Sequence, residues 1–180
     1  MPSQGPFPPT IGQDITGVGT KVWGTPTNIF TSNDQWSICP NGPGGVSHYL
    51  RATGFGFSIP VDSIIDGITT TIEKSISFDF GGEIDDNIVQ LCSAGVQIGD
   101  NKAEVGGWIA VDAVTTYGGS SDLWGNVLTV SIVNASSFGF SVSSKEILGA
   151  SIRSRVDQMT MTVSYHIPPP SLLYPFWFFN

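Results

Sequence analysis

The sequence predicts an all-β protein: an antiparallel, jelly-roll-like two-sheet β-sandwich with an extended N-terminal arm and a C-terminal tail. Three observations indicate this class. Asp, Glu, Lys and Arg make up only 12% of the 180 residues, against about 25% in an average globular protein. The 22 glycines and 12 prolines interrupt the chain at short intervals. Between them, apolar and polar residues alternate, which is the period of a strand with one buried face.

Strand-like alternation begins at residue 47 and recurs to residue 167. In residues 67–80, Ile68, Ile72 and Ile76 share one face. No stretch repeats apolar residues at helical spacing, so we expect no long helix. The expected extended segments cover residues 47–60, 67–80, 86–95, 96–103, 106–119, 122–134, 136–144 and 156–167.

Composition divides the chain into three parts. Residues 46–167 form the expected sandwich, and residues 168–180 form the tail. Residues 1–45 are rich in proline and glycine, and proline fixes φ and removes a backbone donor, so we expect an extended arm there. Trp23 and Trp36 are the exceptions to the polarity of this arm, which indicates that it packs onto another surface.

The tail combines a triple proline with a run of large apolar side chains. Three prolines cannot continue a central strand, so they direct the chain out of the sandwich. The aromatic residues after them would expose more apolar area than a soluble monomer usually tolerates. They could dock on their own sandwich, on another subunit or in a membrane, and we favour another subunit. The expected assembly contacts are Leu172, Leu173, Tyr174, Phe176, Trp177, Phe178 and Phe179, together with Trp23 and Trp36.

Charge and hydropathy argue against two classes of partner. The net charge is −8, and the seven Lys and Arg residues form no cluster. Binding to nucleic acid or to an anionic membrane surface requires clustered basic residues, so we expect neither partner. No apolar run reaches the length of about 20 residues that spans a bilayer. The first residues lack the basic and apolar regions of a signal peptide.

Motifs for catalysis are missing from the sequence. The only two histidines, His48 and His166, lie far apart, and neither a GxSxG turn nor a phosphate-binding loop occurs. We therefore expect a protein that is not an enzyme, with no catalytic residue, no cofactor and no metal. Cys39 and Cys92 are expected to be reduced thiols, with a disulfide between them as the alternative.

Carboxylates cluster in the segment GGEIDDN. Glu83, Asp85 and Asp86 come from this segment, and Asp100 follows in the next predicted turn. Oxygen ligands of this kind bind Ca²⁺ in proteins, but the spacing of an EF-hand is absent. We interpret the cluster as a solvated acidic turn, with calcium binding as the alternative.

The segment YGGSSDLWG allows a ligand platform. Tyr117 and Trp124 could stack on a sugar ring, and Asp122 could accept hydrogen bonds from its hydroxyl groups. We favour a structural interpretation, in which the glycines make a turn, Asp122 caps it, and Trp124 anchors the next strand in the core, with the ligand platform as the alternative. A glycan is therefore a possible partner.

A resemblance adds to this interpretation. The strings LRATGFGFSIP, DGITTTIEKS, DDNIVQL, VQIGDNKA, YGGSSDLWG, NASSFGFSV and VDQMTMTVSY resemble a β-sandwich module of structural proteins from tailed bacteriophages and related environmental viruses. The resemblance covers residues 47–165, so the arm and the tail lie outside it. It implies a virion component that assembles in the host cytoplasm, and it carries no catalytic residue.

Two functions follow as expectations. The first is a non-enzymatic bacteriophage virion protein, a capsid decoration or cement protein or a tail or fibre component. It would latch through its termini onto other virion subunits, either copies of itself or major capsid or tail proteins. The alternative is a carbohydrate-binding module for attachment to a host surface or glycan.

Overall fold

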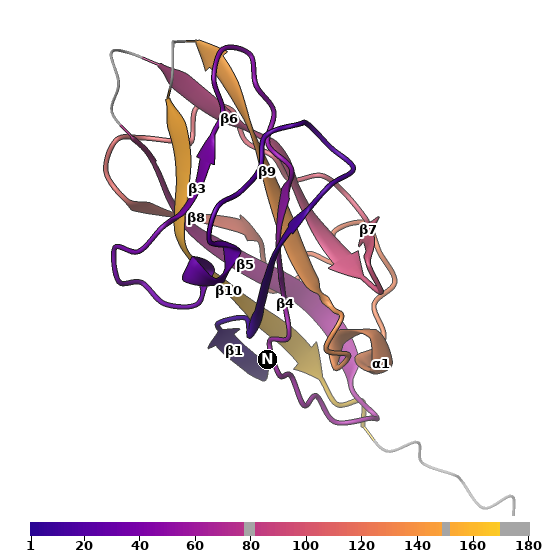
Figure 1. Cartoon of the computed structure of the whole chain (residues 1–180). Helices are drawn as coiled ribbons and strands as arrows, with labels where there is room; N and C mark the ends of the chain where they lie inside the picture. Colours follow the sequence, from indigo (N-terminus) through magenta and orange to yellow (C-terminus); the bar gives the residue numbers. More distant parts are fainter. Residues whose placement is uncertain (78–81, 149–151, 170–180) are drawn as a thin grey trace, which may run out of the picture.

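The computed structural model describes residues 1–77, 82–148 and 152–169 as two sheets packed face to face (Figure 1). The elements are β1 (Ser3–Phe7), β2 (Ile11–Ile15), the 3-10 helix η1 (Pro26–Ile29), β3 (Ser37–Pro40), β4 (Tyr49–Thr53), β5 (Ile64–Ser77), β6 (Glu83–Ser93), β7 (Val96–Ile98), β8 (Ala113–Gly118), α1 (Val130–Val133), β9 (Gly139–Leu148) and β10 (Arg153–His166).

The topology confirms the predicted two-sheet, all-β sandwich. The first sheet has the order β1-β10-β5-β8, and β3 also pairs with β10. The second sheet has the order β2-β4-β9-β6-β7. Each pairing between these strands is antiparallel. The core lies between the sheets and draws on apolar side chains of both.

The N-terminal 45 residues belong to the sandwich, so the predicted separate arm is wrong. In β1, Gln4 lies opposite Val163 of β10, and β2 pairs with β4 along its whole length. The third segment, β3, pairs with the other end of β10. Pro8 and Pro9 lie between β1 and β2, where no ladder hydrogen bond is needed, so they do not prevent the flanking strands from pairing.

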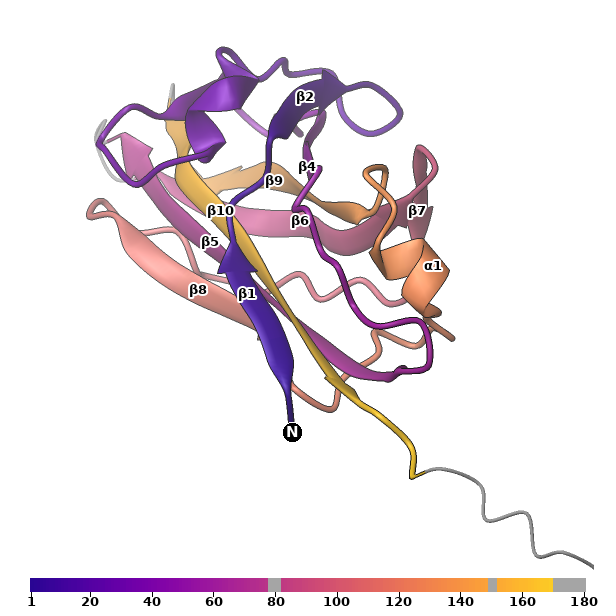
Figure 2. The same ribbon diagram turned by 90° about the horizontal axis from the view of Figure 1, so that it is seen from below.

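The last strand, β10, is central in the first sheet (Figure 2). Its pairing with β5 runs from Arg153 opposite Ser77 to His166 opposite Ile64. Its other edge is shared by β3 near its start and β1 near its end. Segments far apart in sequence therefore hold β10 from both sides up to the residue from which the chain leaves the sandwich.

Side chains of the two long paired strands, β5 and β10, follow the predicted alternation. Ile68, Ile72 and Ile76 of β5 are buried between the sheets, as predicted. In β10, Met159 and Met161 are fully buried on the corresponding face. These strands are long and amphipathic, so local pattern alone places their side chains.

Two predicted strands have a different structure. Residues 122–134 contain the short helix α1, whose N-cap Thr129 accepts a hydrogen bond from the Ile132 amide at 3.3 Å. Leu128 and Val133 are its buried anchors, a spacing that strand alternation does not provide. The strand predicted over 47–60 ends at Thr53, because the next residue, a glycine, adopts a left-handed φ of 73° and redirects the chain.

Candidate functional site

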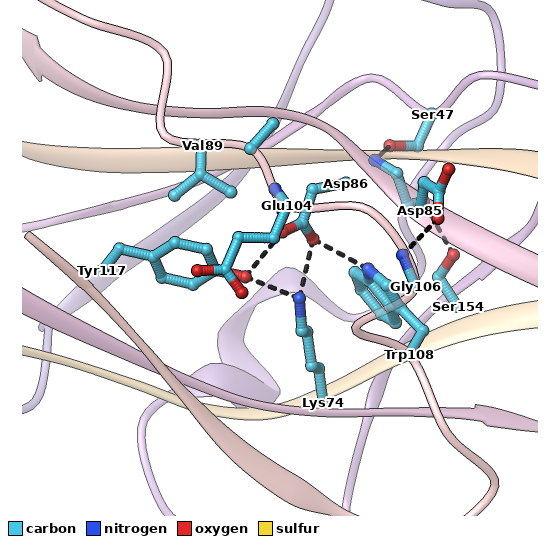
Figure 3. Close-up of polar contacts among 12 residues, drawn as sticks. Ser47, Lys74, Asp85, Asp86, Val89, Glu104, Gly106, Trp108, Tyr117 and Ser154 are labelled. Atoms are coloured by element: carbon cyan, nitrogen blue, oxygen red, sulfur yellow. Dashed lines mark hydrogen bonds and ion pairs between the residues drawn. The ribbon is translucent and has the colours of Figure 1, made fainter.

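A cluster of four polar side chains connects the two sheets inside the core (Figure 3). We name Lys74, Asp86, Trp108 and Tyr117 the inter-sheet cluster. Lys74 comes from β5 and Tyr117 from β8 of the first sheet, Asp86 comes from β6 of the second, and Trp108 lies in the loop before β8. All four residues are buried.

The Asp86 carboxylate is the centre of the cluster. Lys74 Nζ donates to its Oδ1 at 2.8 Å, and Trp108 Nε1 donates to the same oxygen at 2.8 Å. The Tyr117 hydroxyl donates to Oδ2 at 2.7 Å, and the Glu104 amide donates to it at 3.1 Å. Lys74 Nζ also lies 2.5 Å from the Tyr117 hydroxyl oxygen. Each carboxylate oxygen thus has two donors, as a buried charge requires.

The aromatic rings complete the surroundings of the ammonium. Lys74 Nζ lies 5.0 Å from the centre of the Trp108 ring and 5.3 Å from that of Tyr117. Burial lowers the pKa of Lys74, and the charge of Asp86 opposes this shift. Burial also raises the pKa of the Tyr117 hydroxyl, and the Asp86 carboxylate raises it further. The arrangement is suited to holding the two sheets together, because its donors and acceptors are engaged with one another.

This geometry corrects the interpretation of GGEIDDN as a solvated turn. Glu83, Asp85 and Asp86 lie in β6, and only Glu83 of the three is exposed. Asp85 Oδ1 accepts a hydrogen bond from the Gly106 amide at 2.6 Å. Asp100 lies apart, in the exposed turn after β7. Within residues 1–77, 82–148 and 152–169, no three His, Cys, Asp or Glu side chains gather as metal ligands would.

The two-residue alternation of the strands indicated that members of this cluster are buried, and we did not use this signal in the sequence analysis. Lys74 lies two residues after Ile72 and two before Ile76, so β alternation places it on the buried face. Asp86 follows Ile84 by two residues, before a bulge between Asp86 and Ile88 shifts the register. A lysine and an aspartate in phase with buried residues on successive strands predict a buried ion pair.

The alternative of a sugar platform is wrong, because its aromatic side chains are inside the protein. The exposed fraction is 2% for Tyr117 and 0% for Trp124. The Trp124 indole donates to the Ile68 carbonyl at 2.9 Å. Asp122 accepts from the Trp124 amide at 2.8 Å and pairs with Lys102 at 2.9 Å. The structural interpretation of YGGSSDLWG that we favoured, a capped turn with a core anchor, is confirmed.

The two tryptophans expected to contact other subunits both contact their own chain. Trp23 is buried, and its indole donates to the His48 carbonyl at 2.9 Å, so its assignment as an assembly contact is wrong. Trp36 is half-buried; its indole donates to the Asp112 carboxylate at 3.0 Å. The Arg155 guanidinium lies 4.7 Å from the centre of the Trp36 ring.

A second buried polar network lies between β9 and β10. Asn41 donates to the Ser144 hydroxyl at 3.0 Å, and its carbonyl oxygen accepts from the Ser154 hydroxyl at 2.7 Å. The Ser47 hydroxyl accepts from the Ser144 amide at 2.8 Å. Asn41 and Ser47 flank the loop after β3, so this network fixes the N-terminal part of the chain to both sheets. Sequence analysis gave no indication of it.

The remaining reactive side chains are held in separate local contacts. His48 pairs with Asp14 at 2.8 Å, and His166 pairs with Asp66 at 2.7 Å. Cys39 and Cys92 are free, buried thiols on strands of different sheets, as the first of our two alternatives predicted. Burial raises the pKa of Cys39 to about 12 and that of Cys92 to about 11.

An open groove lies at the end of the sandwich where β5 begins. Its volume is about 570 Å³, within the range of about 300–1,000 Å³ of ligand pockets. We name it the end groove. Its lining comes from two segments of the chain: Ile59, Val61, Ser63, Ile64 and Ile65 from the first, and Leu128, Thr129, Val130, Ser131 and Asn134 from the second.

The predicted tail contacts Leu172, Leu173, Tyr174, Phe176, Trp177, Phe178 and Phe179 lie outside the described residues. In the described part of the chain, neither α1 nor η1 has the length and hydropathy of a membrane-spanning helix. No family model, no curated protein and no solved structure matches the sequence or the fold of this chain.

Proposed function

We propose that this chain is a non-enzymatic structural component of a tailed-bacteriophage virion, either a capsid decoration protein or a tail or fibre subunit. The sandwich is its rigid body, and the segment after Pro170 latches onto neighbouring virion subunits. Because residues 1–45 are part of the sandwich, the proposed latch is the C-terminal segment alone.

The position of β10 is the observation that carries this proposal. The tail follows directly on a strand that is hydrogen-bonded on both edges. At its end, His166 pairs with Asp66 of β5 at 2.7 Å. A force on the tail would therefore act on a central strand. Pulling this strand out requires breaking its backbone hydrogen bonds to β5 on one edge and to β1 on the other. This is a suitable attachment for a segment that transmits force between subunits.

The interior of the sandwich supports a rigid body. A buried ion pair and a buried asparagine–serine network each join the two sheets, and satisfied buried polar networks favour a single packing arrangement. The aromatic residues that suggested a sugar platform are used in the core. These features support a structural role over a ligand-binding role.

The energy of docking favours a preformed receptor for the tail. Four aromatic side chains would bury roughly 150–250 Å² each, a gross gain on the order of 15–25 kcal/mol at about 25 cal/mol/Å². Ordering about a dozen residues costs a similar amount, at roughly 1.5 kcal/mol per residue. Docking thus becomes favourable where a rigid neighbour offers an apolar site.

Replacing Phe176, Trp177, Phe178 and Phe179 by serine in the full chain tests the latch. Sedimentation velocity and negative-stain electron microscopy of the wild type should show assemblies, and those of the variant should show monomers. The far-ultraviolet circular dichroism and the urea midpoint should not change, because the sandwich is retained.

A matched control replaces four exposed valines of the sandwich by serine. These are Val96, Val105, Val111 and Val114, with exposed fractions of 65%, 85%, 71% and 64%. This control should assemble like the wild type. Equal assembly of the tail variant and the wild type would contradict the proposal. Electron micrographs of phage particles labelled with an antibody against the sandwich would distinguish head from tail.

A further inference from the structure

The end groove lies beside the point where the tail begins. Ile64, which lines the groove, is the direct pairing partner of His166, the last residue of β10. In Figure 2 the segment between β4 and β5 passes between α1 and the end of β10. The groove walls come from this segment and from the region of α1, so the root of the tail and the groove share one end of the sandwich.

The lining of the groove is suited to an apolar ligand. Asn134, one of its polar residues, is already engaged: its amide accepts from the Ile59 N–H at 2.8 Å and donates to the Ile59 carbonyl at 2.9 Å. The Thr129 hydroxyl caps α1. The remaining walls are mainly aliphatic, and a sugar would find few free polar groups among them.

Exposed aliphatic side chains extend the apolar surface around the groove. Val61 is 83% exposed and Ile64 is 49% exposed, and both line the groove. Val127, next to the lining residue Leu128, is 89% exposed, and Ile167, next to the end of β10, is 59% exposed. Apolar residues gathered at one end of a sandwich are typical of a contact surface.

The tail of this chain has chemistry that matches the groove. Residues 172–179 read LLYPFWFF and carry no charged side chain. Extended chain advances about 3.3 Å per residue, so the ten residues from His166 to Phe176 can span about 33 Å, which is long enough to enter a groove on a second molecule. The prolines at 168–170 favour an extended, stiff chain in the first part of this path, which disfavours a sharp reversal into the groove of the same molecule.

We infer that the end groove of one copy receives residues 172–179 of a second copy, so that two chains exchange their tails reciprocally. This inference rests on the proposed function and names the receptor of the latch. Since the tail root and the groove lie at the same end, a two-fold axis near that end lets both tails cross at once.

A pair of complementary variants tests the exchange. In the groove variant, Val61→Asp and Ser131→Asp place charges at exposed lining positions in each of the two segments that form the groove. In the tail variant, Phe176, Trp177, Phe178 and Phe179 are serine. We expect each variant alone to raise the dimer dissociation constant by more than about tenfold. Mixed together, they should form a heterodimer through the one intact tail and the one intact groove.

A matched control and a double variant accompany this mixture. Val105→Asp changes a valine that is 85% exposed and does not line the groove, and it should dimerise like the wild type. A chain with both defects should form no heterodimer with either single variant, because neither pairing joins an intact tail to an intact groove, and it should stay monomeric alone. Unchanged circular dichroism would verify that each variant is folded.

The outcomes separate this inference from the proposed function. If the tail variant is monomeric but the groove variant assembles normally, the groove is not the receptor, and the latch stands. If the wild type is a monomer and both variants are monomers too, the reciprocal exchange and the proposed latch are both wrong. Heterodimer formation by the mixture supports the exchange.

Cysteine cross-linking gives a second readout. Ile64→Cys in one chain and Trp177→Cys in a differently tagged chain should form a disulfide between the two chains under mild oxidation. The background should be low, because Cys39 and Cys92 have an exposed fraction of 0%. When both substitutions are in one chain at low concentration, a predominantly intramolecular disulfide would show docking of the tail in its own groove and overturn the exchange.

Discussion

The ammonium of Lys74 and the carboxylate of Asp86 lie 2.8 Å apart, with both side chains fully excluded from solvent. The two residues belong to different sheets, so the pair connects the halves of the sandwich across the core. Removing two charges from water costs several kcal/mol per ion, and the hydrogen bonds from Tyr117 and Trp108 offset part of this cost.

Lys74→Met should lower the free energy of unfolding by about 3–5 kcal/mol, because it leaves the Asp86 charge buried without its counterion. Urea denaturation at pH 7 measures the change. Lys145→Met is the matched control: this lysine is exposed on β9, and its replacement should change the free energy of unfolding by less than about 0.5 kcal/mol. Equal, small effects of both substitutions would contradict a buried pair.

Adding Asp86→Leu to Lys74→Met should restore much of the lost stability. The double variant removes both charges, and an apolar pair of similar volume is often neutral relative to a buried ion pair. A double-mutant cycle from urea unfolding should give a coupling energy of at least about 2 kcal/mol. Additive losses would show that the two side chains do not act as a pair.

Alkaline pH should destabilise the fold through its buried thiols. Burial raises the pKa of Cys92 to about 11 and that of Cys39 to about 12, from an ordinary value of 9.0. Above pH 9 the unfolded chain releases protons that the native chain retains, so the free energy of unfolding falls as pH rises. The free energy of unfolding should fall between pH 9 and about 11 because of Cys92, and between pH 9 and about 12 because of Cys39.

Replacing both cysteines by alanine should flatten this pH dependence. Each fully ionised thiol contributes a slope of about 1.4 kcal/mol per pH unit. Urea unfolding at several pH values from 9 to 10.5, under a reducing agent, compares the slopes of the two proteins. The lowered pKa of Lys74 makes the free energy of unfolding rise with pH, which opposes the effect of the thiols. Because both proteins contain Lys74, its contribution cancels when their slopes are compared. Identical slopes would mean that the thiols do not titrate with unfolding.

Trp124→Ala should destabilise the protein by about 3–5 kcal/mol, as expected for a large ring removed from a core. The side chain is fully buried, and its loss also leaves the Ile68 carbonyl without the indole donor. Urea unfolding measures the loss, and Trp36→Ala, at a half-buried position, should cost less. A sugar platform would instead give lost glycan binding at unchanged stability.

Deleting residues 1–8 should destabilise the sandwich by at least about 2 kcal/mol. The deletion uncovers the edge of β10 near its end and removes the tilted contact between the Phe7 and Phe57 rings, whose centres lie 5.5 Å apart. It also breaks two hydrogen bonds of 2.9 Å between the Gln4 side chain and the Ser58 backbone. Hydrogen exchange should accelerate in residues 161–164 of β10. A free arm would leave both the stability and the exchange unchanged.

The sandwich class could be predicted because strand alternation is a local property. Ile68 and Ile72 on β5, or Met159 and Met161 on β10, face the core whatever strand lies beside them. The same rule could have placed Lys74 inside, since it shares their phase. The N-terminal strands were missed because they are short and rich in glycine and proline, and their pairing partners are distant in sequence.

By itself, the sequence determined the all-β class and the buried faces of the long strands, and it shows a C-terminal run, residues 172–179, without a charged side chain. Only the tertiary structure decided that Asp86 meets Lys74, that Trp124 fills the core, and that the groove beside Ile64 lies next to the root of the tail. The physical reason is that the alternation of apolar and polar residues along a strand indicates which face of that strand is buried. Which side chains contact one another on the buried face depends on how the two sheets pack against each other.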